Sequence, residues 1–384
     1  MVIGEKMSEQ KKNKNKQETV EVIFAKNAET VDFGKYHLWY DKGVFKYNLN
    51  KNFSFSKQLS NNCGVFIINA VIDSETEDQY ANKKFLLIVE PQYGAEFLNN
   101  KKLSEDDKEK LRKEDKENSS EDDFNKLIFT NKEKSIYPGK DTINISEIPE
   151  NQRKNCIEKI NSLINYYKVI SGEKIPEIKT EEKNAENKDI RNKNTENKNV
   201  EISIPTFAFN IANIFEVVAR VTISESLKNT DWEVLNGNDN EHEVLKSNKN
   251  NEGKGNEGKG NEEFYINGTV KPDIVIRKKV EENTYKYIII DAKYKSPENK
   301  NRMDRLQILA YAYLYDAHIV GHIFPKKPNG TNKELSSYNI NTIFNKSLDK
   351  NPSDKYKYVE LYLDGSLKGN IEKIFGNKNE KSNN

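Results

Sequence analysis

The chain contains two closely spaced apolar runs, Lys271-Pro272-Asp273-Ile274-Val275-Ile276 and Tyr287-Ile288-Ile289-Ile290-Asp291-Ala292-Lys293. Both are rich in β-branched residues, and the polar stretch 278–285 separates them, so the pattern predicts two strands joined by a turn. Alternate side chains of a strand lie on the same face. Asp291 and Lys293 therefore share one face with Ile289, whereas Ile288, Ile290 and Ala292 lie on the other.

Antiparallel pairing of these two strands would bring Asp273 close to Asp291. Two carboxylates can hold a hard divalent cation that keeps several of its waters, which is how magnesium usually binds. Each of these motifs by itself is weak evidence for a metal site. Pro-Asp is common in turns, and Asp-x-Lys on a strand is usually a solvated face or a local ion pair. Their joint occurrence on the expected elements favours a metal site.

These residues resemble the PD-(D/E)xK phosphodiesterases, with Pro272-Asp273 as the PD half and 291–293 as the (D/E)xK half. Downstream, Gln307 and Tyr311 form a Gln-x-x-x-Tyr element like that of RecB-like nucleases, one helical turn apart. Upstream, the segment 213–219 around Glu216 is similar to the first helix of these domains. Among subfamilies, the chain is most similar to McrC, the nuclease subunit of methylcytosine-dependent McrBC restriction systems. The resemblance covers about residues 206–325.

The resemblance implies a role for each of these residues. Asp273 and Asp291 would bind Mg²⁺, with Mn²⁺ as an alternative, and the backbone carbonyl of Ala292 and the side chain of Glu216 are further candidate ligands. Lys293 would orient the attacking water or neutralise the developing charge. The supporting residues, Gln307 and Tyr311, would position the DNA backbone or the waters on the ion.

The resemblance also implies partners. An McrC-like subunit would cut DNA together with an McrB-like GTPase in trans, and double-strand cleavage would need a homodimer or a larger complex. This chain is expected to bind no nucleotide: Gly253, Gly258 and Lys259 imitate a phosphate-binding loop, but Gly260 stands where Ser or Thr belongs. Two alternatives remain, a free-standing nuclease of defence or repair and a DNA-binding or regulatory subunit that does not cut.

Composition limits the function classes. Lys and Arg total 62 against 61 Asp and Glu, so no overall basic excess indicates nucleic acid and any DNA contact must be local. Basic residues do concentrate between Lys271 and Arg305. The two cysteines, Cys63 and Cys156, show no metal-binding spacing, which argues against zinc. Neither a secretory signal nor an apolar run long enough for a bilayer is present, so we expect a cytoplasmic protein without membrane contact.

Charged, Asn-rich segments divide the chain. We expect a disordered tail at 1–17, an N-terminal domain at 18–175, a linker at 176–200, a nuclease domain at 201–376 and a tail at 377–384. Residues 101–123 and an insertion at 236–262 should also be disordered or solvated, because they hold almost no large apolar side chains.

The predicted fold class is α/β. The C-terminal half should form a restriction-endonuclease-like mixed sheet flanked by helices, with helices at 207–227 and 302–315 and strands near 231–235, 270–277, 285–293 and 317–324. The N-terminal domain should be a strand-rich α+β domain for contact with a partner or substrate, with strands near 20–24, 36–40, 64–68 and 84–89 and a helix at 151–170.

Overall fold

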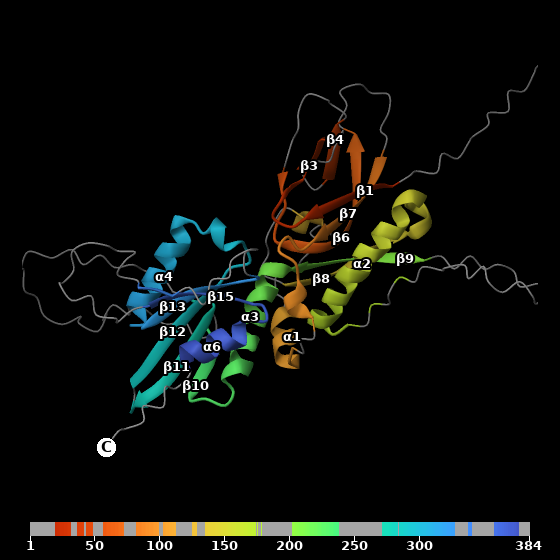
Figure 1. Ribbon diagram of the computed structural model, residues 1–384. Helices are drawn as coiled ribbons and strands as arrows, with labels where there is room; N and C mark the ends of the chain where they lie inside the picture. The colour runs from red at the N-terminus through yellow and green to blue at the C-terminus, as the bar shows by residue number, and fades with distance from the viewer. Residues whose placement is uncertain are drawn as a thin grey trace, which may run out of the picture.

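The computed structural model of the protein contains two mixed β-sheets that lie side by side, one from each half of the chain (Figure 1). It describes residues 20–31, 37–41, 44–48, 57–72, 82–99, 103–112, 125–128, 135–173, 175, 178, 202–237, 271–282, 284–326, 337–339 and 357–375. The tails at 1–17 and 377–384, nearly all of the expected insertion and linker, and residues 253–259, whose sequence imitates a phosphate-binding motif, lie outside these residues.

The C-terminal sheet has the strand order β10-β11-β12-β13-β15-β14. Strands β10, β11 and β12 are antiparallel, β12, β13 and β15 are parallel, and β14 is antiparallel to β15. The bounds are β10 Trp232–Asn236, β11 Ile274–Glu281, β12 Thr284–Ala292, β13 Ile319–Phe324, β14 Ser337–Asn339 and β15 Lys357–Tyr362. This arrangement confirms the predicted α/β class and its mixed sheet.

Helices cover both faces of this sheet. Helices α3 (Ile211–Leu227) and α6 (Leu367–Phe375) lie on one face, and α4 (Arg302–Leu314) lies on the other (Figure 1). The alternation along β12 separates the two cores as predicted, because Ile288 and Ile290 pack with α3, whereas Ile289 packs with α4. Each of these isoleucines is nearly fully buried, which stabilises the fold by about 1.5–3 kcal/mol per side chain.

The N-terminal sheet has the order β1-β7-β6-β4-β3, with β9 pairing β6 and β8 pairing β9. Helix α2 (Glu150–Ser171) covers one face and ends at Gly172, whose φ of +70° suits a left-handed C-cap. The bounds are β1 Glu21–Lys26, β3 His37–Asp41, β4 Val44–Asn48, β6 Asn62–Ile72, β7 Asn82–Glu90, β8 Ile136–Asn144 and β9 Ser203–Asn210, with a separate pair β2 Thr30–Val31 and β5 Lys57–Gln58.

The two halves share a core. One buried cluster runs from α2 and the N-terminal sheet through α3 to the C-terminal sheet. Strand β9 lies beyond the expected linker in sequence, yet it pairs with β6 and β8 of the N-terminal sheet and passes directly into α3. The C-terminal half is therefore attached to the N-terminal sheet by a continuous strand-to-helix connection.

Two sequence-based expectations were wrong. The helix expected from 207 begins only at Ile211, because 207–210 complete β9 and the Asn210 side chain caps the helix by accepting from the backbone N–H groups of Ala212 and Asn213. The segment 101–123 was expected to be solvated, but α1 (Glu105–Arg112) forms within it. Leu111 of this otherwise charged helix and Leu103 just before it are buried in the core, and Asp107 pairs with Arg220 of α3.

Within the described residues, no helix combines the length and the apolar character needed to cross a membrane.

Candidate active site

Strands β11 and β12 bring the two predicted aspartates together. Ile274 pairs with Ile290 across the antiparallel ladder, so Asp273, just before β11, lies beside the end of β12. The backbone N–H of Ala292 donates to Asp273 Oδ2 at 2.6 Å. Asp291 is fully buried, whereas Asp273 is partly accessible. The predicted antiparallel pairing therefore gives one carboxylate that is buried within the sheet, Asp291, and one just before the start of β11, Asp273.

The electrostatics of this pair are unfavourable without a cation. Burial, followed by the negative charges of Asp291 and Glu216, raises the pKa of Asp273 well above its usual range. Burial also raises the pKa of Asp291, against the opposing effect of Lys293. Asp291 Oδ1 is buried without a hydrogen-bond donor. Buried oxygens of this kind are normally satisfied, so the pocket has the charge and the free lone pairs that a cation would use.

The donor set fits a hard divalent cation. Among the residues that the structure describes, no three His, Cys, Asp or Glu side chains gather closely enough to form a metal cluster by themselves. Two carboxylates would leave most coordination positions to waters, a backbone carbonyl or a substrate oxygen, which suits Mg²⁺ and not a structural zinc. Ala292, between Asp291 and Lys293, remains the predicted carbonyl ligand.

Lys293, Gln307 and Tyr311 form one connected chain of contacts. Lys293 Nζ lies 2.6 Å from Asp291 Oδ2 and donates to Gln307 Oε1 at 3.1 Å. Gln307 Nε2 donates to the Tyr311 hydroxyl at 2.7 Å, and that hydroxyl donates to the Lys271 carbonyl at 3.0 Å. The Gln-x-x-x-Tyr element of α4 therefore holds both the lysine and the backbone just before Asp273.

The charge state of Lys293 follows from the same contacts. Burial would lower its pKa, but the negative charge of Asp291 and the hydrogen bond to it raise the pKa overall. Helix α4 is held in place at its start by a reciprocal cap, in which Asn301 accepts from the Asp304 N–H and Asp304 accepts from the Asn301 N–H. Lys293 is therefore a charged ammonium held in place by Asp291 and by Gln307 of this capped helix.

Glu216 lies near the pair but outside it. It projects from α3 and is partly buried, and its negative charge contributes to the raised pKa of Asp273. It does not join Asp273 and Asp291 in a three-carboxylate cluster. From this position, Glu216 is better placed to contact a bound cation through a water molecule than to coordinate it directly.

Sequence reasoning missed a buried polar network on β13 and β15. His322 pairs in register with Asp291, and its Nε2 lies 3.8 Å from Asp291 Oδ2. Its Nδ1 lies 2.8 Å from the hydroxyl of Tyr358, which in turn donates to Glu360 at 3.3 Å, and Lys300 forms an ion pair with Glu360. Burial lowers the pKa of His322 to about 3. The available signal was Tyr358, Glu360 and Tyr362 at alternate positions of an otherwise apolar strand.

Tyr294 was also missed. It follows Lys293 and connects the site to the N-terminal half: its hydroxyl donates to the Gly94 carbonyl at 2.9 Å and accepts from the Tyr93 N–H at 3.2 Å. Its ring lies 5.8 Å from that of Phe215, the neighbour of Glu216. Because this partner is some 200 positions away in sequence, no local pattern indicated the contact.

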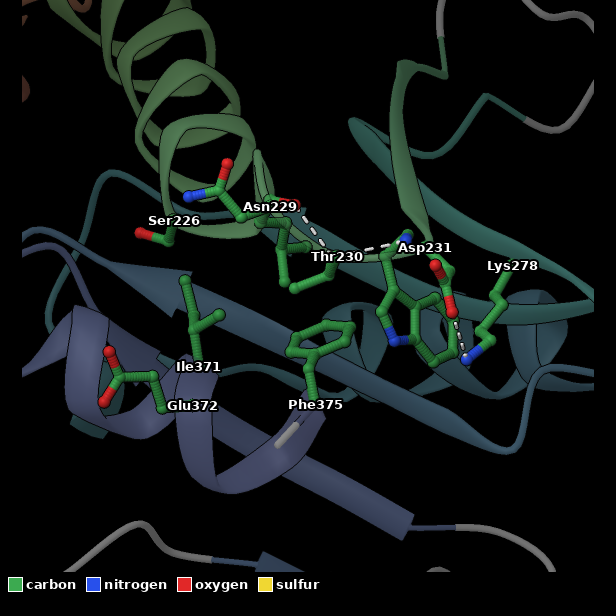
Figure 2. A pocket seen from close by; sticks show the side chains of 10 residues that line it. Ser226, Asn229, Thr230, Asp231, Lys278, Ile371, Glu372 and Phe375 are labelled. Carbon is green, nitrogen blue, oxygen red and sulfur yellow. Dashed lines mark hydrogen bonds and ion pairs between the residues drawn. The ribbon is translucent and has the colours of Figure 1, made fainter. Parts of the chain in front are cut away.

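A pocket of about 190 Å³ lies away from these residues, between the end of α3, β10 and α6. Trp232 and Phe375 form its apolar wall, with their ring centroids 5.1 Å apart, and Asp231 pairs with Lys278 at 3.1 Å (Figure 2). Lys278 is near the other end of β11 from Asp273. None of the predicted site residues lines this pocket.

Comparison with known proteins supports the motif-based resemblance. Residues 190–325 match the family model described as McrBC 5-methylcytosine restriction system component, which confirms the resemblance of this region to McrC-like subunits. No curated protein sequence gives a significant match. The chain also matches a solved structure, a refined half-complex from the tetradecameric assembly of Thermococcus gammatolerans McrB AAA+ hexamers with bound McrC, at 16% identity and a TM-score of 0.29. That match covers 44% of this chain and 34% of that chain, so the matched part spans about a third of the length of that chain.

Proposed function

We propose that this chain is a Mg²⁺-dependent DNA endonuclease, the McrC-like cleavage subunit of a 5-methylcytosine-dependent restriction complex that acts with an McrB-like GTPase. The observation that carries the proposal is the convergence of Asp273, Asp291 and Lys293 at the end of β12, where Asp291 Oδ1 is buried without a hydrogen-bond donor. The family match over 190–325 gives the biological setting.

The residues would act as follows. Asp273 and Asp291 would hold the cation, with the Ala292 carbonyl as a further ligand. A divalent cation bound there would lower the pKa of a coordinated water and neutralise charge on the scissile phosphate. Lys293 would keep its proton, because Asp291 raises its pKa, and would stabilise the negative charge that develops on phosphate oxygens.

The supporting residues would maintain this geometry. Gln307 fixes the position of the Lys293 ammonium, and Tyr311 fixes both Gln307 and the backbone at Lys271. Glu216 would orient waters on the side of Asp273 that faces α3. Substrate cleavage at one such site breaks one strand, so cutting both strands would require two copies in the complex.

The test is cleavage of methylated and unmethylated plasmid in Mg²⁺ or EDTA, with and without a McrB-like GTPase and GTP. We expect Asp291→Asn and Lys293→Met to lower the cleavage rate by at least about 100-fold, as expected for the loss of a group that stabilises the transition state. Lys373→Met, on the exposed surface of α6, is the matched control and should cut normally.

Calorimetric titration with Mn²⁺ provides a readout independent of turnover, since Asp291→Asn should weaken or abolish binding in a variant that still unfolds cooperatively. Undiminished cleavage by this variant would refute the assigned site. Cleavage by the chain alone, without GTP, would instead indicate a free-standing nuclease. Metal binding without cleavage under any condition would indicate a non-cleaving subunit.

A further inference from the structure

Helix α4 has an exposed face unlike the rest of the described surface. Among the described residues, four large hydrophobic side chains are exposed, and three of them lie on α4: Met303 at 69%, Leu306 at 46% and Tyr313 at 85%. Arg302, Arg305 and Ala310 are exposed beside them. We call these six residues the outer face of α4. The opposite side of the helix packs on the sheet through Ile308 and Tyr311.

The two arginines of this face are unusual in this chain. Only 7 of its 62 basic residues are arginine. Four other arginines within the described residues have partners. Arg220 and Arg277 form ion pairs with Asp107 and Glu233, and Arg112 and Arg153 donate hydrogen bonds to backbone carbonyls. By contrast, no carboxylate among the described residues lies within ion-pair distance of Arg302 or Arg305. Arginine recognises phosphate in a planar, two-pronged geometry, so two exposed guanidiniums with no carboxylate partner in the described part of the chain favour a phosphate-bearing partner.

The charge of the outer face selects among partners. The one acidic residue of α4, Asp304, is buried and paired with Lys295, so the face carries two positive charges and no exposed carboxylate. Two copies meeting through this face would bring four guanidiniums together without counter-charges. A polyanion meets the same face favourably, and its sugars and bases can contact the exposed apolar side chains.

The position of this face ties it to the site. Met303 precedes Gln307 by one helical turn, so the two side chains are neighbours along α4. Gln307 accepts from Lys293, which contacts Asp291. A strand of DNA lying along the outer face would therefore pass the candidate site at its edge.

We propose that the outer face of α4 is a DNA-docking surface: Arg302 and Arg305 contact backbone phosphates, while Met303, Leu306 and Tyr313 pack against sugars and bases. This inference rests on the proposed function, since it names the surface by which that site receives its substrate. The surface acts before any bond is broken and needs no divalent cation.

The experiment measures docking without cleavage. A fluorescein-labelled DNA duplex is titrated with the full chain in EDTA, and fluorescence anisotropy is followed over a series of salt concentrations. The double variant Arg302→Ala/Arg305→Ala should bind about 10-fold more weakly, and its plot of log affinity against log salt should be shallower by about 2, because two phosphate contacts are lost. The control Lys368→Ala/Lys373→Ala removes two charges from exposed positions of α6 and should bind like the wild type.

The apolar side chains have a different signature. Tyr313→Ala should weaken binding about fivefold without changing the salt slope, because stacking and apolar contact release no counterions. Equal affinity and equal salt slope in the arginine variant and the wild type, or no binding by the wild type at low salt, would overturn the docking surface. A change of sedimenting mass on Leu306→Ala would also overturn it and assign the face to a protein partner.

DNA affinity and cleavage, measured separately, distinguish the docking surface from the candidate active site. Asp291→Asn should retain the wild-type affinity in EDTA while losing cleavage. If the arginine variant binds normally and Asp291→Asn still abolishes cutting, the nuclease stands and the docking surface does not.

Discussion

Replacing Tyr294 by Phe tests whether the N-terminal half holds the candidate site in place. The substitution keeps the ring, which packs between Phe97 and Phe215 at centroid distances of 6.3 and 5.8 Å, and removes only the hydroxyl. That hydroxyl makes two hydrogen bonds, to the Gly94 carbonyl and from the Tyr93 N–H, both in a partly buried region.

The expected loss of stability in Tyr294→Phe follows from these two hydrogen bonds. A typical intramolecular hydrogen bond contributes about 1 kcal/mol net, and partial access of water to the freed backbone groups keeps the cost near that value for each bond. We therefore expect the free energy of unfolding to fall by about 2 kcal/mol. The matched control is Tyr313→Phe, because the Tyr313 side chain is 85% exposed, and it should change the stability by less than about 0.5 kcal/mol.

Two assays report on this change. Urea unfolding followed by tryptophan fluorescence uses one tryptophan in each half, Trp39 and Trp232. Backbone hydrogen exchange should become faster at Tyr93 and through the strand end at 292–295. In Mg²⁺, cleavage should slow because Tyr294 directly follows Lys293 and its ring contacts the neighbour of Glu216.

Unchanged stability and unchanged exchange at Tyr93 would refute the claim that this contact joins the two halves. A loss of stability with normal cleavage by the folded variant would show that the contact stabilises the chain without positioning the site.

Three further outcomes follow from the same structure. Asp273→Asn should raise the thermal midpoint of the metal-free protein at neutral pH, because a carboxylate whose pKa is raised by burial lowers the stability when it is ionised. In differential scanning fluorimetry, added Mg²⁺ should stabilise the wild type more than this variant. A lower midpoint for the variant would contradict this electrostatic account. Gly321→Ala should destabilise by about 1–3 kcal/mol in urea unfolding, because its Cβ would lie 2.3 Å from the Val359 carbonyl oxygen, whereas Gly369→Ala on α6 meets no atom within 4 Å and should stabilise by about 0.5–1 kcal/mol. Asn210→Ala should cost about 1 kcal/mol in the same assay through loss of the α3 cap, and a cost below about 0.3 kcal/mol would mean that water replaces the cap.

Local pattern by itself determined most of the C-terminal fold. The alternation along 287–293 placed Asp291 and Lys293 on one face, and the apolar spacing of 302–315 predicted the helix that carries Gln307 and Tyr311. These features depend on side-chain period and on neighbours within one or two turns, which a sequence displays directly. The structure confirms these elements and brings the side chains of Asp273, Asp291, Lys293, Gln307 and Tyr311 within one connected region.

Only the tertiary structure decided how those elements meet the rest of the chain. The segment 203–210 pairs with the N-terminal sheet, Tyr294 bonds to Gly94, and His322 lies beside Asp291 through parallel pairing of β12 with β13. Helix α1 docks through Leu111 and the preceding Leu103, which reach a core built by distant residues. Each of these contacts joins residues far apart in sequence, and its energy exists only after the intervening chain has folded, so no local period records it.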